Sequence, residues 1–159
     1  MEYTKDIETA IKNVDANKKL VRKLQKAKSK EVDERIHQLH DAAFEKIDCL
    51  KCANCCKTTS PIFRDVDVKR IAKHLRMPES KFLDQYLRMD EEGDWVLKQS
   101  PCHFLQDDNT CSIYEVRPLA CGEYPHTNRK NMQQILNLTL KNTLICPAVA
   151  RIFEGMGTA

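Results

Sequence analysis

Eight cysteines in a chain of 159 residues constrain this protein more than any other feature of its sequence. No run of apolar residues approaches the roughly 18 that a membrane helix needs, and the start, Met-Glu-Tyr-Thr-Lys-Asp, lacks the pattern of a signal peptide. We therefore expect a cytoplasmic protein with no membrane association. In a reducing compartment thiols do not pair durably into disulfides, so closely spaced cysteines there are metal ligands or redox groups.

The cysteines fall into two sets that differ in spacing. The first set reads Cys49-x2-Cys52-x2-Cys55-Cys56. A Cys-x2-Cys step lets two thiolates converge on one metal, and a third Cys at the same interval wraps the loop further around it. Cys56 points away from its neighbour in an extended loop, so it could bind a second metal, serve as an alternative ligand or act as an exposed redox thiol. The second set is spread over the second half of the chain: Cys102, Cys111, Cys121 and Cys146.

The spacing of the cysteines is compatible with two kinds of metal centre, a zinc site and an iron-sulfur cluster. All-cysteine zinc sites usually pair two short Cys-x2-4-Cys segments, whereas the second half offers only Cys-x8-Cys and Cys-x9-Cys. The first motif with the remote Cys146-Pro147 is similar to the arrangement around bacterial-type iron-sulfur clusters, although their fourth Cys lies closer in sequence. We therefore favour an iron-sulfur cluster, of the 4Fe-4S type, over Zn2+. Eight thiols are enough for two four-thiolate sites, and His103 or His126 could complete a zinc shell.

The order of the motifs along the chain resembles one family. After the first motif come Pro101-Cys102-His-Phe-Leu105, then Cys111-Ser-Ile-Tyr114-x2-Arg117-Pro118-x2-Cys121-x2-Tyr124-Pro125, and finally Cys146-Pro147. This succession, over about residues 48 to 153, resembles the YkgJ-like family of zinc- or iron-chelating CxxCxxCC proteins. The resemblance implies metal binding through the cysteines and no particular reaction. The candidate ligands are Cys49, Cys52, Cys55, Cys56, Cys102, Cys111, Cys121 and Cys146.

Helical periodicity dominates the rest of the chain. From Ile7 to Ile47 there is no Gly or Pro, and the apolar residues predict two helices or one bent helix, with Ser29 capping the second. A third helix is predicted to begin near Asp65 or Asp67. A fourth follows Pro78 and includes Leu87, and a terminal helix opens at Pro147.

Short β-prone segments complete the predicted fold, which is mainly α. Trp95–Lys98 is one such segment, and residues 102–105 and 111–114 are predicted to form a minor β-hairpin because Gln-Asp-Asp-Asn-Thr between them suits a tight turn. Residues 132–144 fit either a helix or a strand. We therefore expect a small helical Cys-rich metal-binding domain, preceded by an N-terminal helical arm.

The predicted arm spans residues 1–47 and the metal-binding domain residues 48–159. The arm is basic over residues 18–30, but the formal charge of the whole chain is only +3 and acidic residues return at Glu31. A solvated helix face explains such a run, so we expect no nucleic-acid partner. The apolar stripe of the arm leaves open its pairing with another helix or with an unknown protein partner.

Three functions fit these cysteines. The first is an iron-sulfur or iron protein with a redox or electron-transfer role. The second is a zinc-stabilised interaction module that docks through the N-terminal helices. The third is a metal-dependent enzyme of unknown reaction, for which the sequence shows no recognised nucleophile, carboxylate pair or nucleotide motif. In each case the ligation free energy is also folding free energy, so we expect metal-free protein to be partly unfolded.

Overall fold

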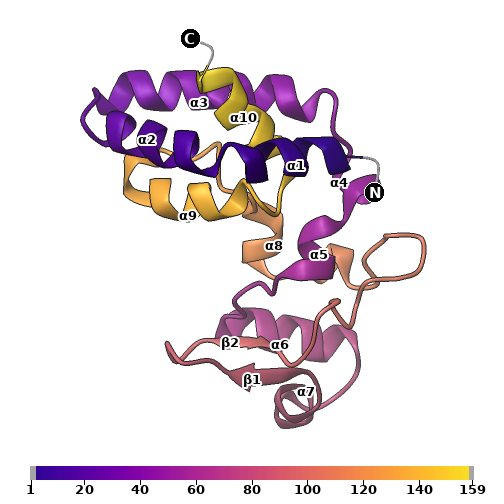
Figure 1. The fold of residues 1–159 in the computed structure, drawn as a ribbon. Helices are drawn as coiled ribbons and strands as arrows, with labels where there is room; N and C mark the ends of the chain where they lie inside the picture. Colours follow the sequence, from indigo (N-terminus) through magenta and orange to yellow (C-terminus); the bar gives the residue numbers. More distant parts are fainter. Residues whose placement is uncertain (1–2, 158–159) are drawn as a thin grey trace. The chain divides into compact units, whose positions relative to one another are not determined.

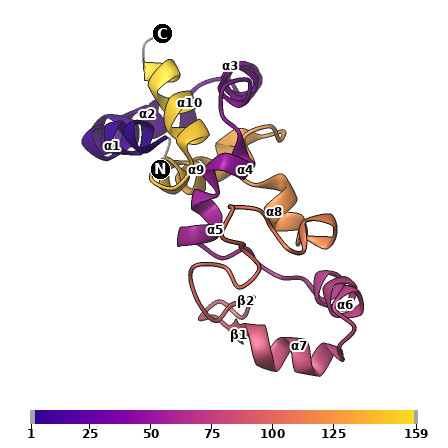
Figure 2. The ribbon, with the colours of Figure 1, turned by 90° about the vertical axis from the view of Figure 1, so that its right-hand side faces the viewer.

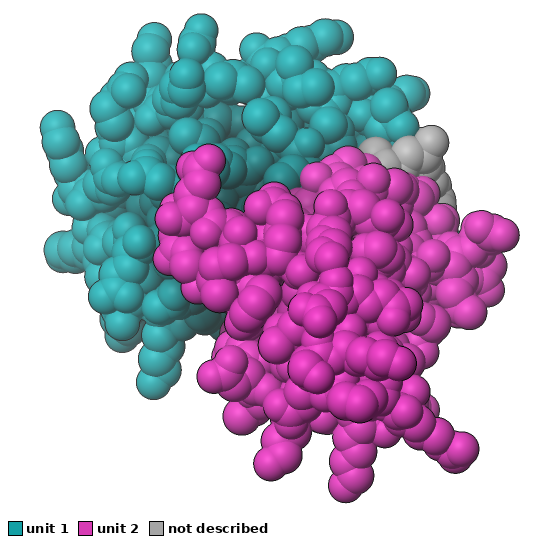
Figure 3. Space-filling model, turned by 90° about the horizontal axis from the view of Figure 1, so that it is seen from below, with its two compact units in different colours: residues 1–52, 125–159 teal, residues 53–124 magenta. Residues whose placement is uncertain are grey.

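The structure, a computed structural model, describes residues 3–157 and is mainly α, as predicted. Figure 1 shows its helices and a two-stranded antiparallel sheet. The chain separates into two compact units (Figure 3): unit 1 runs up to Cys52 and resumes at Pro125, and unit 2 comprises residues 53–124. The expected boundary between an arm and a domain at residues 47 and 48 stays a prediction. None of the described helices is both long enough and apolar enough to cross a membrane.

Unit 1 is built from helices at the two ends of the chain. They are α1 (Thr4–Lys12), α2 (Val14–Gln25), α3 (Ser29–Phe44), α4 (Cys49–Cys52), the 3-10 helix η2 (Met132–Ile135), α9 (Leu136–Asn142) and α10 (Pro147–Gly157). The long periodic segment near the N-terminus therefore forms three helices rather than two, because the chain breaks at Asn13 between α1 and α2. Ser29 is the first residue of α3 and not its cap, since Lys28 takes the extended capping conformation.

The predicted C-terminal helix is confirmed, and it is the centre of unit 1. α10 packs against α1, α2, α3 and α9, and Figure 2 shows it between the α1–α2 pair and α3. Its sequence is apolar around most of its circumference, and Val149, Ile152 and Phe153 are almost fully buried. A Cβ atom at Gly155 would lie 2.8 Å from Leu39 Cδ2, so any larger residue there would require the Leu39 side chain to shift.

Polar contacts attach the segment after Pro125 to α3. The carboxylate of Asp33 accepts hydrogen bonds from the backbone N–H groups of Asn131 and Met132, both at 2.9 Å. His40 Nδ1 lies 2.7 Å from the Thr127 hydroxyl oxygen. Residues 132–144, which fitted either structure in the sequence, are mostly helical, in η2 and α9.

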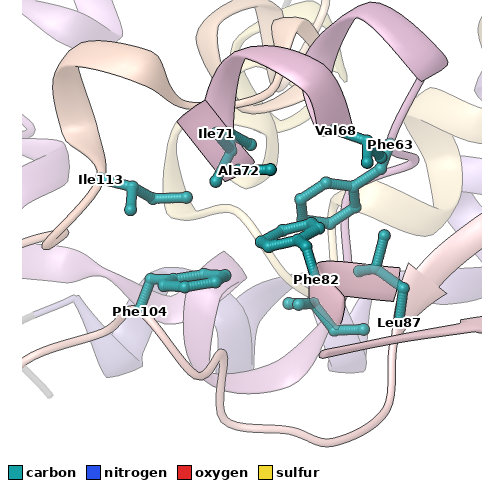
Figure 4. Packing of buried hydrophobic residues seen from close by; sticks show 9 residues of the cluster. Phe63, Val68, Ile71, Ala72, Phe82, Leu87, Phe104 and Ile113 are labelled. Atoms are coloured by element: carbon teal, nitrogen blue, oxygen red, sulfur yellow. The ribbon is translucent and has the colours of Figure 1, made fainter. Parts of the chain in front are cut away.

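Unit 2 surrounds an aromatic core. Its elements are α5 (Asn54–Thr58), α6 (Asp65–His74), α7 (Glu79–Tyr86), β1 (Leu87–Met89), β2 (Trp95–Leu97), the 3-10 helix η1 (Tyr114–Val116) and α8 (Leu119–Glu123). Phe82 is fully buried at the centre (Figure 4), stacked on Phe104 with ring centroids 6.2 Å apart and tilted toward Phe63 at the same distance. The helices predicted near Asp65 and after Pro78 are α6 and α7.

The β-hairpin lies earlier in the chain than predicted. β1 and β2 pair antiparallel, with Leu87 opposite Leu97, so Leu87 begins a strand instead of continuing α7. Asp90 Oδ1 accepts the N–H groups of Glu92 and Asp94, each at 2.9 Å, and Gly93 supplies the positive φ of 83° that the connecting loop needs. In the predicted hairpin, residues 102–114, an isolated antiparallel bridge forms between Leu105 and Cys111, and the chain then turns into η1.

Candidate metal centre

All eight cysteines are present as thiols. Unit 1 contains Cys49, Cys52 and Cys146, and unit 2 contains Cys55, Cys56, Cys102, Cys111 and Cys121. The division between the units falls just after Cys52, inside the first motif. The motif that looks continuous in the sequence is therefore shared by two compact units.

The three thiols of unit 1 lie near one another. Cys49 and Cys52 are three residues apart in the single turn of α4, which places them on one face of that helix. Asp48 starts this turn, because its Oδ1 accepts the Leu50 N–H at 3.0 Å and its carbonyl accepts the Cys52 N–H at 3.0 Å. Cys146 lies immediately before α10, and its sulfur accepts backbone hydrogen bonds from Ala148 and Val149.

Burial controls the ionisation of Cys146. Burial first, and then the neighbouring Cys49 and Cys52, raise the pKa of this thiol to about 11, against the hydrogen bonds from the start of α10, which lower it. A buried thiol beside two others ionises reluctantly unless a cation compensates the charge. The three side chains are thus a donor set that a thiophilic metal would stabilise.

Unit 2 groups four of its thiols. The Cys102 N–H donates to the Cys56 carbonyl at 2.7 Å, which holds the Cys102 segment against α5. The antiparallel bridge between Leu105 and Cys111 then places Cys111 beside the same segment. Cys121 lies in α8 and is close enough to Cys56, Cys102 and Cys111 for all three to raise its pKa.

The turn predicted between Cys102 and Cys111 is present and brings their segments together. The Gln106 N–H donates to the Thr110 carbonyl at 2.8 Å, and Asn109 takes a positive φ of 67°. Asp108 Oδ1 accepts both the N–H and the hydroxyl of Thr110, at 3.1 and 2.6 Å. These local side-chain bonds are typical of Asp in tight turns.

The four grouped thiols of unit 2 differ in pKa, and Cys56 is the one whose pKa is lowered. Burial, together with the nearby thiols, raises the pKa of Cys121 to about 12 and also raises the pKa values of Cys102 and Cys111. A hydrogen bond from the Cys55 thiol lowers the pKa of Cys56 to about 7, against its burial. Cys56 is therefore the thiol of this group that ionises most readily, and a metal cation would favour ionisation of the other three.

Arg117 lies at the edge of this group. Its guanidinium carbon is 4.1 Å from the centroid of the Tyr114 ring, and Nη1 donates to the Tyr114 carbonyl at 2.8 Å. The positive charge lowers the pKa values of Cys111 and Cys121 in part, although burial keeps both raised. Arg117 therefore orders the loop before Cys121 and contributes a favourable field at two of the thiols.

The donor chemistry of both groups suits a metal, but the thiols have not converged. Among the described residues, no three His, Cys, Asp or Glu side chains are arranged so that they could hold a metal ion as they stand. Sulfur atoms in both groups nevertheless accept backbone N–H bonds, as Cys102 does from Phe104 at 3.5 Å. Such bonds stabilise thiolates at metal centres.

His103 takes no position among the thiols. Its ring packs edge-on against Tyr86, with centroids 5.2 Å apart, and its buried Nε2 has no hydrogen-bond partner within the described part of the chain. The sequence placed His103 beside Cys102 as a possible zinc ligand. In the structure it extends the aromatic cluster around Phe82.

A buried ion-pair cluster in unit 2 was not identified as functional from the sequence. Asp67 is completely buried in α6 and pairs with Arg64 and Arg70, at 3.0 and 2.9 Å. The signal was available, because Arg64-x2-Asp67-x2-Arg70 places both arginines within reach of one carboxylate at the start of a helix. In the sequence, Asp67 indicates only the start of a helix.

A mainly helical fold with grouped thiols on short helices and turns is typical of cysteine-rich metal-binding proteins. Residues 48–143 match the CxxCxxCC family, described as a "putative zinc- or iron-chelating domain". The chain therefore belongs to this family, as its motif order predicted. No curated protein and no solved structure matches the chain.

Proposed function

We propose that this protein binds metal at two all-cysteine centres and that it is an iron-sulfur protein with a redox or electron-transfer role. The observation that carries the proposal is the sorting of the thiols into one group of three in unit 1 and one group of four in unit 2. One four-thiolate centre uses four cysteines, so the group of four in unit 2 matches one such centre and the group of three in unit 1 supplies most of a second.

The unit 2 centre would be held by Cys56, Cys102, Cys111 and Cys121. Each pair of neighbours in this set is joined by a backbone contact or by an electrostatic interaction between the sulfurs. The unit 1 group supplies Cys49, Cys52 and Cys146. In the sequence, Cys55 completes the Cys-x2-Cys-x2-Cys spacing.

Iron-sulfur chemistry is favoured for the set that includes the first motif. Cys-x2-Cys-x2-Cys with a remote Cys-Pro is similar to the ligand pattern of bacterial-type clusters. When bound, such a cluster exchanges single electrons. The residues of this chain would set its potential through burial, as at Cys146, and through N–H bonds to sulfur from the start of α10.

Zinc is the second candidate, and the unit 2 group favours it there. Four thiols on α5, α8 and one turn give the closed donor set of a structural zinc site, which has no position left for substrate. In that case unit 2 would be a zinc-stabilised interaction module. An enzymatic role would require an open coordination position.

Elemental analysis on protein purified without oxygen tests the proposal. We expect iron with acid-labile sulfide, about four of each per cluster, and a brown visible spectrum. Stoichiometric zinc without sulfide would contradict the iron-sulfur assignment and favour the zinc module. No bound metal under reducing conditions would contradict both.

Cysteine variants then test the two groups. We expect Cys121→Ser to lower the metal content of the unit 2 centre alone, and Cys146→Ser that of the unit 1 centre alone. Ser112→Ala is the matched control, because Ser112 is exposed and adjacent to Cys111. Full metal content in both Cys variants would reject the assigned groups.

A further inference from the structure

The Asp67 carboxylate in α6 accepts hydrogen bonds from its own helix and from the start of α8. Its Oδ2 accepts the Arg64 backbone N–H at 2.9 Å and Arg64 Nε at 3.0 Å. Its Oδ1 accepts Arg64 Nη2 at 3.0 Å, Arg70 Nη2 at 2.9 Å and the Leu119 backbone N–H at 3.3 Å. One buried carboxylate thus connects the start of α6 to the start of α8.

Arg70 strengthens the same connection. Its Nε donates to the Val116 carbonyl at 3.2 Å, and its Nη2 donates to the Arg117 carbonyl at 2.8 Å. A planar guanidinium held by a carboxylate can bind two neighbouring carbonyls in a fixed geometry, which a lysine ammonium cannot do. α6 therefore holds the backbone of residues 116–119 through side chains from one face.

α8 depends on this support because it cannot define its own position. It contains five residues, far fewer than an isolated helix needs, and no side chain caps its first turn. Pro118 immediately precedes it, and the Cys121 N–H donates to the Pro118 carbonyl at 3.0 Å. The position of Cys121 thus follows from the position of residues 116–119.

We propose that Arg70, held in place by Asp67, is a positioning residue that places Cys121 within the four-thiol group of unit 2. This inference rests on the proposed unit 2 centre and adds residues that no cysteine motif contains. Arg70 does not contact the metal. It fixes the backbone that presents one ligand, and changes to residues that orient metal ligands typically weaken binding by about 10- to 100-fold.

The structure offers a matched pair of variants. Arg64 and Arg70 bind the same carboxylate and are similarly exposed, with 48% and 39% of their side chains accessible. Of the two, Arg70 is the one that also holds the carbonyls of Val116 and Arg117. Arg64→Lys and Arg70→Lys both keep the positive charge, including the attraction of position 64 for Glu123.

The experiment measures metal release from the full-length purified protein to a chelator under reducing, oxygen-free conditions. The same variants are loaded with Co2+ alone, and the absorption of the tetrahedral cobalt-thiolate centre is recorded. We expect Arg70→Lys to release metal at least about tenfold faster and to weaken the cobalt spectrum, with Arg64→Lys close to wild type. Equal release and equal spectra for the two variants would overturn the proposal.

A second pair of variants, at Leu119, distinguishes loss of positioning from a general folding defect. Leu119→Pro removes the N–H that donates to Asp67 but leaves both arginine pairs in place, and proline is tolerated in a first helical turn. Leu119→Ala keeps the N–H and removes a side chain that is already exposed. We expect faster release in Leu119→Pro only, and equal release in both variants would also overturn the proposal.

Cys121→Ser separates this proposal from the proposed function. If Cys121→Ser and wild type bind Co2+ alike, the assigned unit 2 centre is rejected. The positioning role of Arg70 is then rejected as well. If Cys121→Ser loses the cobalt spectrum while Arg70→Lys matches Arg64→Lys, only the positioning role is wrong.

Discussion

Asp67 is a fully buried charged residue of unit 2. Its burial by itself would raise the pKa of the carboxyl group, but hydrogen bonds from Arg64, Arg70 and the Leu119 backbone outweigh it and hold the pKa well below its ordinary value. A carboxylate with a depressed pKa stabilises the folded state above the unfolded-state pKa, near about pH 4. That contribution is lost as the pH falls toward the folded-state pKa.

Replacement of Asp67 by asparagine should remove both stability and its acid dependence. We expect Asp67→Asn to lower the free energy of unfolding by about 2 kcal/mol at neutral pH, since hydrogen bonds between charged groups are lost. Between about pH 5 and pH 2.5 the wild type should lose more stability than the variant. Denaturant unfolding at several pH values measures both effects. Asp65→Asn, an exposed neighbour in α6, is the control, and identical pH profiles for Asp67→Asn and wild type would refute the assignment.

Short helices attached by polar contacts are the recurring elements of this protein. α1 has nine residues and buries mainly Ala10, so its own sequence gives it little stability. The Arg151 guanidinium in α10 binds both carboxylate oxygens of Asp6 in α1, at 2.9 and 3.1 Å. A cavity of about 480 Å³ opens beside this ion pair, between α1, α3 and α10. The ion pair therefore attaches α1 to α10 where the side chains beside it are not closely packed.

Loss of that ion pair should loosen α1 alone. Arg151→Met keeps the length of the side chain but removes the charge, and we expect about 1 kcal/mol less protection, or about fivefold faster amide exchange, in α1. Amides in α3 should be unaffected, because the hydrogen bonds of α3 to residues 127–132 do not involve Arg151. Hydrogen exchange read residue by residue measures this, with the exposed Arg22→Met as control. Equal acceleration in α1 and α3 would contradict it.

At the scale of the whole molecule, metal ligation would add to the stability of two small cores. Unit 2 buries a cluster around Phe82, and unit 1 buries the apolar faces of α10 and its neighbours. Several thiols lie on helices that are too short to be stable alone, among them the one-turn α4 and the five-residue α5 and α8. Metal binding would tie these elements to the better-packed helices.

Chelation under reducing conditions should therefore unfold part of the molecule. Structural zinc contributes on the order of 10 kcal/mol in model peptides, so we expect weaker far-ultraviolet circular dichroism and a lower melting temperature after metal removal. Restoring the metal should reverse both changes, which serves as the control. If the melting curve after chelation overlays that of the loaded protein, the metal has no structural role.

Local signals determined most helices and turns. α6, α7 and α10 were predicted from periodicity and from proline or acidic residues at their starts, and the turn before Thr110 from its Asp and Asn residues. The hairpin was misplaced because Leu87 fits a helical stripe as well as a strand. Its pairing with Leu97 decides between them, and that contact crosses the loop closed by Asp90.

The sequence by itself determined that this chain is mainly helical and belongs to a zinc- or iron-chelating family, because both follow from short-range spacing of residue types. Only the tertiary structure decided which cysteines are neighbours. It assigns Cys52 and Cys56, which stand four residues apart in the sequence, to different compact units, and it groups Cys56 with the distant Cys121. The physical reason is that thiols meet through the packing of α5, the 102–111 turn and α8, and such long-range contacts leave no periodic trace in the sequence.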